Sequence, residues 1–434
     1  MPDRIPVLIV TYYFPPAGGP GVQRILKFCK YLTDHHIQPV VLTVRNGEYP
    51  NTDLSLMSDV ADDLPVYQTP IVEPYRFYKR FTGMKQSDSF GVAFVKKEKS
   101  STPSWKEKLA LWIRGNLFIP DARFLWKWTA IPAGLDIIKK HGIRAIVTTG
   151  PPHSTHLIGR NLKKRTGLPW LADFRDPWTG IDYYSKFPLT RWADRKHRRL
   201  ESAVLNEADE VVVVSKSMKT AFAALTDTPI TVIPNGYDDA ELPATPPKPP
   251  ADLWVVGYVG NMYPVRNWET VATLFASMVT QSPAMADRFR LKLIGNEDGS
   301  VIDRFEKAGL GPYLIRKGYL PHDQAIQELY TCHALLLVIN DEPGNTHVLT
   351  GKLFEYLGTG RPILFSGPVP GDAWDLLSQT GRAVNLGEGF ILPPFADLEK
   401  QPVLTAFTRR SLTRQLALRI KTMIHQQDHH HEES

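Results

Sequence analysis

Short runs of β-branched and aliphatic residues alternate with segments of helical periodicity along most of the chain. This alternation predicts βαβ units built around parallel sheets. In the first half, strands are expected at residues 5–11, 37–44, 144–148, 170–173, 210–215 and 230–233, with a helix over 21–34. Residues 46–103 show little periodicity, and the pattern predicts no structure for them.

A proline-rich segment at residues 243–250 interrupts this alternation. It lacks the amide donors that helices and sheets need, so it is typical of a semi-rigid linker. Beyond it, strands are expected at 254–259, 289–294, 313–316, 334–339 and 362–365, and helices at 267–280, 322–330 and 351–357. The pattern therefore predicts an α/β protein of two Rossmann-like domains, 1–242 and 253–398, joined by a linker at 243–252.

The last apolar repeat predicts a C-terminal helix over 399–425, followed by a polar tail at 426–434. Its apolar positions are Leu404, Phe407, Leu412, Leu416, Ile420 and Met423. A helix with this stripe is able to pack across both domains. If the two domains face each other, the carboxyl ends of both sheets meet at one cleft, where open α/β sheets bind ligands.

Composition and charge narrow the class of protein. With 434 residues, 43% of them hydrophobic and 22% charged, the chain is typical of a globular protein and not of a disordered or fibrous one. Residues 1–250 carry 34 basic against 25 acidic residues, whereas residues 251–434 carry 17 against 20. The basic half is expected to face an anionic partner. No nucleic-acid recognition motif accompanies it, so nucleic acid is not expected.

Membrane spans and disulfides are not expected either. The longest strongly apolar run, residues 334–339, is far shorter than the ~18 residues that span a bilayer. Cys29 and Cys332 are too few for a disulfide framework or a cysteine-based metal site. A reducing compartment is therefore favoured, and the cytoplasm is the default expectation.

The sharpest chemical signal is a strand, a loop and a helix that begins near Gly351. The amides at such a helix start form an anion site, to which Lys352 adds a full positive charge. Glu355 lies three residues further on the same helix face. An ammonium beside a carboxylate suits a phosphate beside vicinal hydroxyls, which describes a nucleotide. A surface ion pair on an ordinary helix is the alternative.

These residues also resemble a known family. The strings at 351–357 (GKLFEYL) and 360–363 (GRPI) resemble the donor-site motif of family 4 glycosyltransferases. Segments at 15–19 (PPAGG), 173–178 (DFRDPW), 233–238 (IPNGYD) and 257–261 (GYVGN) agree with it. The resemblance implies a GT-B fold with the C-terminal helix crossing back, and transfer of a sugar from a nucleotide-sugar with retention of configuration.

The resemblance also implies residue roles. Glu355 corresponds to the glutamate that holds the nucleotide ribose, and Lys352, flanked by Gly351 and Leu353, lies where a basic residue meets the diphosphate. Gly18 and Gly19 resemble the glycine loop that lets the first domain approach the donor phosphates; a plain turn after a strand is the alternative. Their spacing is not that of a dinucleotide fingerprint.

Two positions depart from the family pattern. His347 occupies the place of a second glutamate, and Asn261 occupies that of an arginine, which leaves Arg266 as the nearest basic residue. His347 is a candidate for hydrogen bonding to a hexose hydroxyl. Because no Asp-x-Asp pair has a convincing loop context, no metal or other cofactor is expected; Lys352, Arg266 and helix N-termini would stabilise the leaving diphosphate.

Three residues of the first half are candidates for catalysis. Arg175 and Asp176 stand where many family members have a histidine, so that Arg175 is expected to bind acceptor phosphate or steady the Asp176 carboxylate, which would orient an acceptor hydroxyl. His153 follows a strand and begins a helix, so it too faces the cleft. A buried structural Arg–Asp pair and a histidine without a catalytic role are the alternatives.

Two segments suggest where the acceptor lies. Residues 105–114 mix tryptophan with cations at helical spacing, and residues 191–199 form a dense cationic face. Such segments favour an anionic membrane surface, although packing on the sheet or a solvated helix face would explain them too. With the family resemblance, they favour a UDP- or GDP-sugar donor and a lipid-linked saccharide acceptor in surface-polysaccharide assembly, at the inner leaflet. A nucleotide-sugar epimerase and a catalytically silent GT-B scaffold remain alternatives.

Overall fold

Two compact units make up the protein. The computed structural model describes residues 4–49, 51–72, 105–181, 184–185, 187–340, 345–387 and 404–432. Unit 1 comprises Met1–Pro234 and Arg409–Ser434, and unit 2 comprises Asn235–Thr408. The chain thus passes from one unit to the other between Pro234 and Asn235, ahead of the proline-rich segment that the sequence suggested as the linker.

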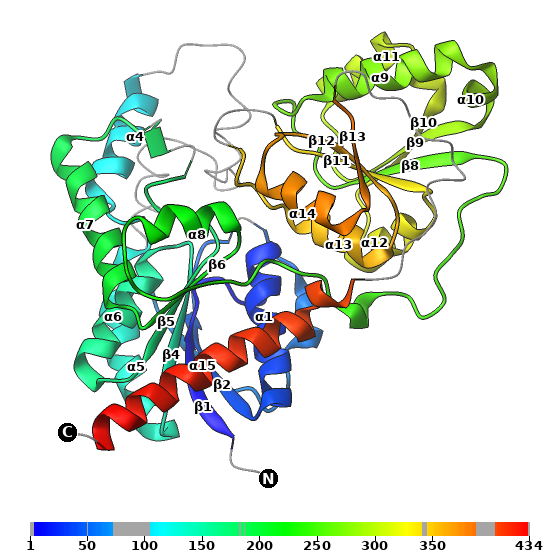
Figure 1. The fold of residues 1–434 in the computed structure, drawn as a ribbon. Helices are drawn as coiled ribbons and strands as arrows, with labels where there is room; N and C mark the ends of the chain where they lie inside the picture. The colour runs from blue at the N-terminus through cyan, green and yellow to red at the C-terminus, as the bar shows by residue number, and fades with distance from the viewer. Residues whose placement is uncertain are drawn as a thin grey trace. The chain divides into compact units, whose positions relative to one another are not determined.

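Unit 1 is a doubly wound α/β unit (Figure 1). Within the described residues its seven strands pair in parallel in the order β3-β2-β1-β4-β5-β6-β7. The strands are β1 (Ile5–Val10), β2 (Ile37–Val44), β3 (Val66–Thr69), β4 (Ala145–Gly150), β5 (Trp170–Phe174), β6 (Glu210–Val213) and β7 (Ile230–Val232). The helices are α1 (Pro20–Leu32), α4 (Trp105–Leu117), α5 (Lys127–His141), α6 (Ser154–Thr166), α7 (Arg191–Glu207), α8 (Lys216–Ala223) and α15 (Arg409–Glu432).

Unit 2 repeats the architecture with six parallel strands among the described residues, in the order β10-β9-β8-β11-β12-β13. The strands are β8 (Trp254–Val259), β9 (Phe289–Ile294), β10 (Leu314–Gly318), β11 (Ala334–Val338), β12 (Ile363–Ser366) and β13 (Ala383–Asn385). The helices are α9 (Trp268–Gln281), α10 (Pro283–Arg288), α11 (Gly299–Lys307), α12 (His322–Tyr330), α13 (Gly351–Thr359) and α14 (Asp372–Thr380). Two Rossmann-like units confirm the expected fold class.

Both faces of each sheet are covered. In β1, Leu8 and Val10 join one apolar cluster, whereas Val7 and Ile9 join another on the opposite face. Burial on both faces explains the nearly continuous aliphatic runs of the sequence. The strand order reverses between β1 and β4 in unit 1 and between β8 and β11 in unit 2. These two reversal points are where doubly wound sheets bind ligands.

The predicted C-terminal helix is confirmed, but it begins later than expected. Leu404 and Phe407 precede it and pack against an apolar cluster of unit 2. Thr408 has extended backbone and forms a bridge with Tyr237, which separates these residues from α15. From Arg409 onward α15 belongs to unit 1, where it packs on α1 (Figure 1). The expectation that one helix carries the whole apolar repeat is therefore wrong.

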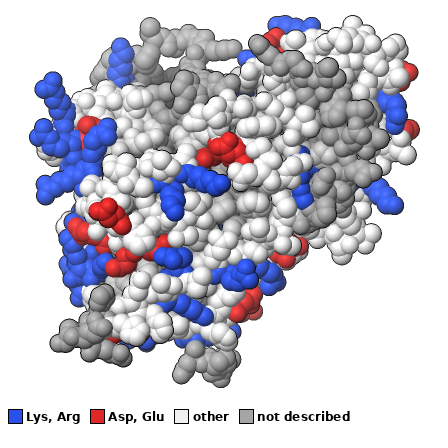
Figure 2. Space-filling view, viewed as in Figure 1, with Lys and Arg blue, Asp and Glu red and all other residues white. Residues whose placement is uncertain are grey.

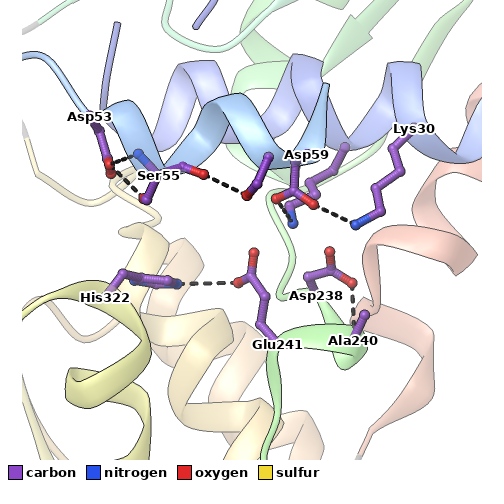
Figure 3. Close-up of polar contacts among 10 residues, drawn as sticks. Lys30, Asp53, Ser55, Asp59, Asp238, Ala240, Glu241 and His322 are labelled. Carbon is purple, nitrogen blue, oxygen red and sulfur yellow. Dashed lines mark hydrogen bonds and ion pairs between the residues drawn. The ribbon is translucent and has the colours of Figure 1, made fainter. Parts of the chain in front are cut away.

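The segment for which the sequence predicted no structure contains described elements only in part. Residues 54–59 form a 3-10 turn, and β3 follows it at the edge of the sheet. Asp59 ties this turn to α1, accepting hydrogen bonds from Lys27 Nζ at 2.6 Å and Lys30 Nζ at 2.5 Å. Figure 3 shows Lys30 reaching Asp59. Residues 73–104 lie outside the described part.

Candidate functional site

The candidate donor site of unit 2 lies at its reversal point. The chain leaves β8 through Gly260, whose φ of +121° favours glycine. A Cβ on Gly260 would lie 2.7 Å from Lys352 Nζ, so the missing side chain lets the Lys352 ammonium come close to the backbone. Lys352 itself stands in the first turn of α13. The loop after β8 and the start of α13 are thus brought together.

Two cations of this site meet at one hydroxyl. Lys352 Nζ donates a hydrogen bond to Tyr258 Oη at 2.9 Å, and Arg266 Nη1 donates another to the same oxygen at 2.6 Å. The Lys352 Nζ also lies 4.0 Å from the centroid of the Tyr258 ring. Among the described residues, neither Lys352 nor Arg266 forms an ion pair with a carboxylate. The two positive charges are therefore gathered without an ion-pair partner among the described residues, and the nearest negative charge that acts on Lys352 is that of Glu355 on the same helix.

The surroundings act on the ionisation of these groups. Burial, and next the charge of Arg266, hold the pKa of Lys352 well below its ordinary value, while Glu355 opposes the shift. Burial raises the pKa of Tyr258 to about 12, although Arg266 acts in the opposite direction. Tyr258 is therefore a neutral phenol at neutral pH, and the surroundings of Lys352 destabilise its ammonium form.

The N-terminus of α13 lies beside these cations. Within the described part of the chain, the N-cap residue Thr350 makes no side-chain capping bond, and its buried hydroxyl has no hydrogen-bond partner. Glu355 lies one turn along α13, is partly buried, and makes no hydrogen bond or ion pair with the described residues. This helix start, Lys352 and Glu355 are the groups that the sequence analysis assigned to a diphosphate and its ribose, and that assignment stays a prediction.

The remaining donor-site candidates have different surroundings. The Leu353 side chain is fully buried in the core, so only its backbone is able to contribute. The Asn261 side chain donates to Tyr263 Oη at 3.1 Å and accepts from Asn296 Nδ2 at 3.0 Å, while the Asn261 carbonyl accepts from Tyr258. His347 is partly buried in the segment before α13. Tyr258, which sequence reasoning passed over, is the residue that links this set.

The glycine loop of unit 1 lies between β1 and α1. Gly19 has a φ of +111°, and a Cβ there would meet nothing within 4 Å, so the backbone faces open space. Gly18, by contrast, lies against Asp53. The close approach in this loop is made at Gly21, where a Cβ would overlap the Arg175 guanidinium. Arg175 thus lies against the start of α1, next to the glycine loop.

The Arg175 and Asp176 side chains have different surroundings. Arg175 Nε donates to the Gly150 carbonyl at 3.2 Å, and a second guanidinium nitrogen donates to the Pro151 carbonyl. Burial lowers the pKa of Arg175, and Asp176 opposes this shift. Asp176 is exposed. The guanidinium is therefore fixed by the loop after β4, while the carboxylate beside it faces outward.

His153 joins a buried aromatic cluster. Its ring stacks on Trp178 at 4.9 Å between centroids, and its buried Nδ1 has no hydrogen-bond partner among the residues that the structure describes. Burial, followed by the neighbouring His156 and Arg175, places the pKa of His153 well below its ordinary value. At neutral pH the ring is uncharged, which suits a hydrogen-bonding role better than that of a strong base.

A buried ion pair that sequence reasoning missed supports this edge of unit 1. Arg24 Nη2 lies 2.8 Å from Asp173 Oδ1, and Arg24 also donates to the carbonyls of Ile233 and Pro234. Thr149 Oγ1 donates to Asp173 at 2.8 Å. Arg24 follows the glycine loop in sequence, and Asp173 is the first residue of the DFRDPW string. Their positions next to two motifs were the sequence signal that could have indicated this pair.

Metal and membrane features add little to this site. Within the described residues, no three His, Cys, Asp or Glu side chains converge as metal ligands. The expectation that no metal is required stays a prediction. Across the same part of the chain, every helix is too short or too polar to cross a bilayer.

Comparison with known proteins matches part of the chain to a family. Residues 92–241 match the model of the family described as Glycosyltransferase Family 4. The chain is a glycosyltransferase of GT-B type, with a family 4 segment at residues 92–241. The resemblance to family 4 glycosyltransferases is thereby confirmed, whereas retention of configuration and a role in surface-polysaccharide assembly stay predictions. This match ends before α13, so the roles of Lys352 and Glu355 in this glycosyltransferase stay predictions.

Solved structures agree on the fold over nearly the whole chain. Sucrose-phosphate synthase from Thermosynechococcus elongatus is 15% identical, with a TM-score of 0.53, covering 99% of each chain. HepE from Anabaena, solved in complex with UDP, is 14% identical with a TM-score of 0.53, covering 99% of this chain and 100% of its own. The lipopolysaccharide outer core galactosyltransferase WaaB is 13% identical with a TM-score of 0.53, covering 96% and 100%. No curated protein matches the sequence.

Proposed function

We propose that this glycosyltransferase takes a hexose from a UDP- or GDP-sugar bound in unit 2 and transfers it, with retention, to a lipid-linked saccharide. One observation carries the donor half of the proposal: Lys352 and Arg266 converge beside an uncapped helix start, without a carboxylate partner among the described residues. Glu355, one turn along the same helix, is left to bind the ribose hydroxyls. The complex of HepE with UDP supports a uridine nucleotide as the first ligand to test.

The chemistry of transfer explains why cations are needed there. When the bond between the sugar C1 and the diphosphate oxygen breaks, negative charge develops on the departing nucleoside diphosphate and positive charge on the sugar. Lys352, Arg266 and the amides of α13 would stabilise the departing group. Arg175, Asp176 and the neutral His153 remain the candidates for binding the acceptor or the reacting sugar.

A surface of unit 1 supports a membrane-borne acceptor. On α7 the side chains of Trp192 and Lys196 are exposed, and Lys196 Nζ lies 4.7 Å from the Trp192 ring centroid. Helix α4, which packs on α7, exposes Trp112 and Leu117. Figure 2 shows cationic side chains gathered over this side of unit 1. Tryptophan and basic side chains together favour an anionic headgroup region. WaaB, a lipopolysaccharide galactosyltransferase, supports an acceptor of this class.

Donor use tests the proposal directly. A panel of UDP- and GDP-sugars is screened for thermal stabilisation, and the donor that binds is then supplied with and without a lipid-linked saccharide. Lys352→Met and Glu355→Gln are each expected to lower turnover by roughly 100-fold or more while the protein stays folded. Near-normal turnover in both variants would refute the donor site. Consumption of donor without acceptor would instead favour an epimerase, and absence of any donor binding would favour a silent scaffold.

Membrane attachment is tested by sedimentation with liposomes. We expect binding to vesicles that contain phosphatidylglycerol, weaker binding to phosphatidylcholine alone, and loss of binding when Trp192 and Lys196 are changed to alanine. The control variant changes Lys219, an exposed cation on α8, and leaves Phe222, which the same helix buries in the core of unit 1, intact. Equal binding of the two vesicle types would contradict an electrostatic membrane site.

A further inference from the structure

Tyr258 occupies an unusual place for a polar side chain. It lies in β8, which is otherwise apolar, and its side chain is fully buried. The ring packs edge to face on Trp268 at 4.9 Å between centroids, so the position of the hydroxyl is fixed by the core of unit 2. A buried hydroxyl must find partners, and the partners it finds are the two cations of the candidate donor site.

The Tyr258 hydroxyl uses its full hydrogen-bonding capacity. It donates its proton to the Asn261 carbonyl at 2.9 Å, and it accepts one hydrogen bond each from Lys352 and Arg266. One donor and two acceptor positions are all that a phenol has. Because the proton is engaged by Asn261, both lone pairs must face the cations. The geometry of the loop after β8 therefore sets the direction in which the lone pairs of the Tyr258 hydroxyl oxygen point.

The Tyr258 hydroxyl offsets the repulsion between Lys352 and Arg266 in the protein without ligand. Lys352 and Arg266 repel each other, and Arg266 is one of the causes that lower the pKa of Lys352. The groups that face Lys352 are Tyr258 and Arg266 from β8 and its loop, and Glu355 from its own helix. Without an oxygen between them, two like charges would move apart towards water. A shared neutral acceptor holds them together at modest cost.

We propose that Tyr258 is a positioning residue for the donor site, whose hydroxyl holds Lys352 and Arg266 together in the empty protein so that both are in place when a nucleoside diphosphate binds. This inference rests on the proposed function, since it names what orients the cations of that same site. The diphosphate oxygens take over the hydrogen bonds of both cations, and Tyr258 then keeps its bond to Asn261. Pre-organisation of this kind raises affinity without adding a contact to the ligand.

The test compares Tyr258→Phe with wild-type protein, using UDP as the probe, or GDP if wild type binds only that. Phenylalanine keeps the ring that packs on Trp268 and removes only the shared acceptor. We expect the affinity to fall about tenfold at neutral pH, which is the effect of losing one hydrogen bond to a charged group. We also expect the loss of affinity with rising pH to begin at a lower pH, because Lys352 loses a group that stabilises its ammonium.

Tyr356→Phe is the matched control. Tyr356 is equally buried and its hydroxyl accepts a hydrogen bond from the Val259 amide at 3.0 Å, so its loss affects the same strand without touching the cations. This variant is expected to be less stable yet to bind UDP with the wild-type pH profile.

The outcomes separate this inference from the function on which it rests. If wild type binds neither UDP nor GDP, the donor site itself is wrong. If wild type binds and Tyr258→Phe binds equally well with the same pH profile, only the positioning role is overturned. Binding is read from the ligand-induced rise in melting temperature as well as by calorimetry, so that a destabilised variant still gives an answer.

Discussion

Two pairs of cations, one pair in each unit, have opposite surroundings. In unit 1, Arg24 is fully buried and bonded to the Asp173 carboxylate, and Lys27 is bonded to Asp59. In unit 2, Lys352 and Arg266 share the neutral Tyr258 hydroxyl instead. A cation with a carboxylate beside it is already neutralised, and its role is structural. Among the described residues, the two cations that share the phenol have no carboxylate partner, which supports the proposal that unit 2 binds an anion.

Removing a neutralised cation should cost the most stability. Arg24→Met leaves the Asp173 carboxylate buried beside Thr149 without its counter-charge. The free energy of unfolding of unit 1 is expected to fall by about 3–5 kcal/mol. Urea unfolding followed by circular dichroism measures this change. Arg198→Met, which removes an exposed ion pair with Asp194, is the control and should change stability by less than about 0.5 kcal/mol.

A loss below about 1 kcal/mol in Arg24→Met would contradict the first half of the comparison. It would mean that the pair is not what holds this edge of unit 1 together.

Removing Lys352, the cation without a carboxylate partner among the described residues, should change the free energy of unfolding in the opposite direction. Lys352→Met takes an ammonium out of partly buried surroundings and is expected to raise the stability of the ligand-free protein by about 1 kcal/mol. The same variant should lose the stabilisation that UDP confers on wild type. Melting temperatures with and without UDP measure both effects.

Lys292 supplies a matched control within unit 2. Its ammonium donates to Glu328 at 2.8 Å and to Thr331 at 2.6 Å, so Lys292→Met removes a lysine that does have a carboxylate partner. This variant should be destabilised and should keep the response to UDP. If Lys352→Met were destabilised as much as Lys292→Met, the distinction between cations with and without a carboxylate partner would be wrong.

The pH dependence gives the smallest of these effects. Because the folded protein lowers the pKa of Lys352, the unfolded chain binds more protons between the folded and the unfolded pKa values. Stability contributed by this group therefore rises with pH across that interval. The advantage of Lys352→Met over wild type should be full below the folded pKa and vanish above the unfolded value of about 10.4. Unfolding of both proteins at pH 7 and pH 10 measures it; an advantage that grew with pH would contradict the sign.

The fold was largely predictable because buried parallel strands leave a strong signal. Strands β2 and β8 and helix α12 have the predicted bounds. The start of α15 was not predictable, because Leu404 and Phe407 continue its apolar spacing although they pack in the other unit. Periodicity records that a side chain is buried and does not record which core buries it.

Prediction of the site depended on whether a residue carries charge. Lys352, Arg266 and Glu355 stand out in the sequence, and the structure brings the two cations together. Tyr258 does not stand out, since an aromatic residue in an apolar strand is expected to be core. Its role depends on a bond across 94 residues of sequence to Lys352, a relation that no local pattern contains.

A crystal structure of the protein with UDP is the most direct test of the central claim that the cations of unit 2 await a diphosphate. The account predicts phosphate oxygens within hydrogen-bond distance of Lys352 Nζ and the Arg266 guanidinium, with the ribose hydroxyls on Glu355. Density for the diphosphate away from α13, with Lys352 still bonded to Tyr258, would contradict it.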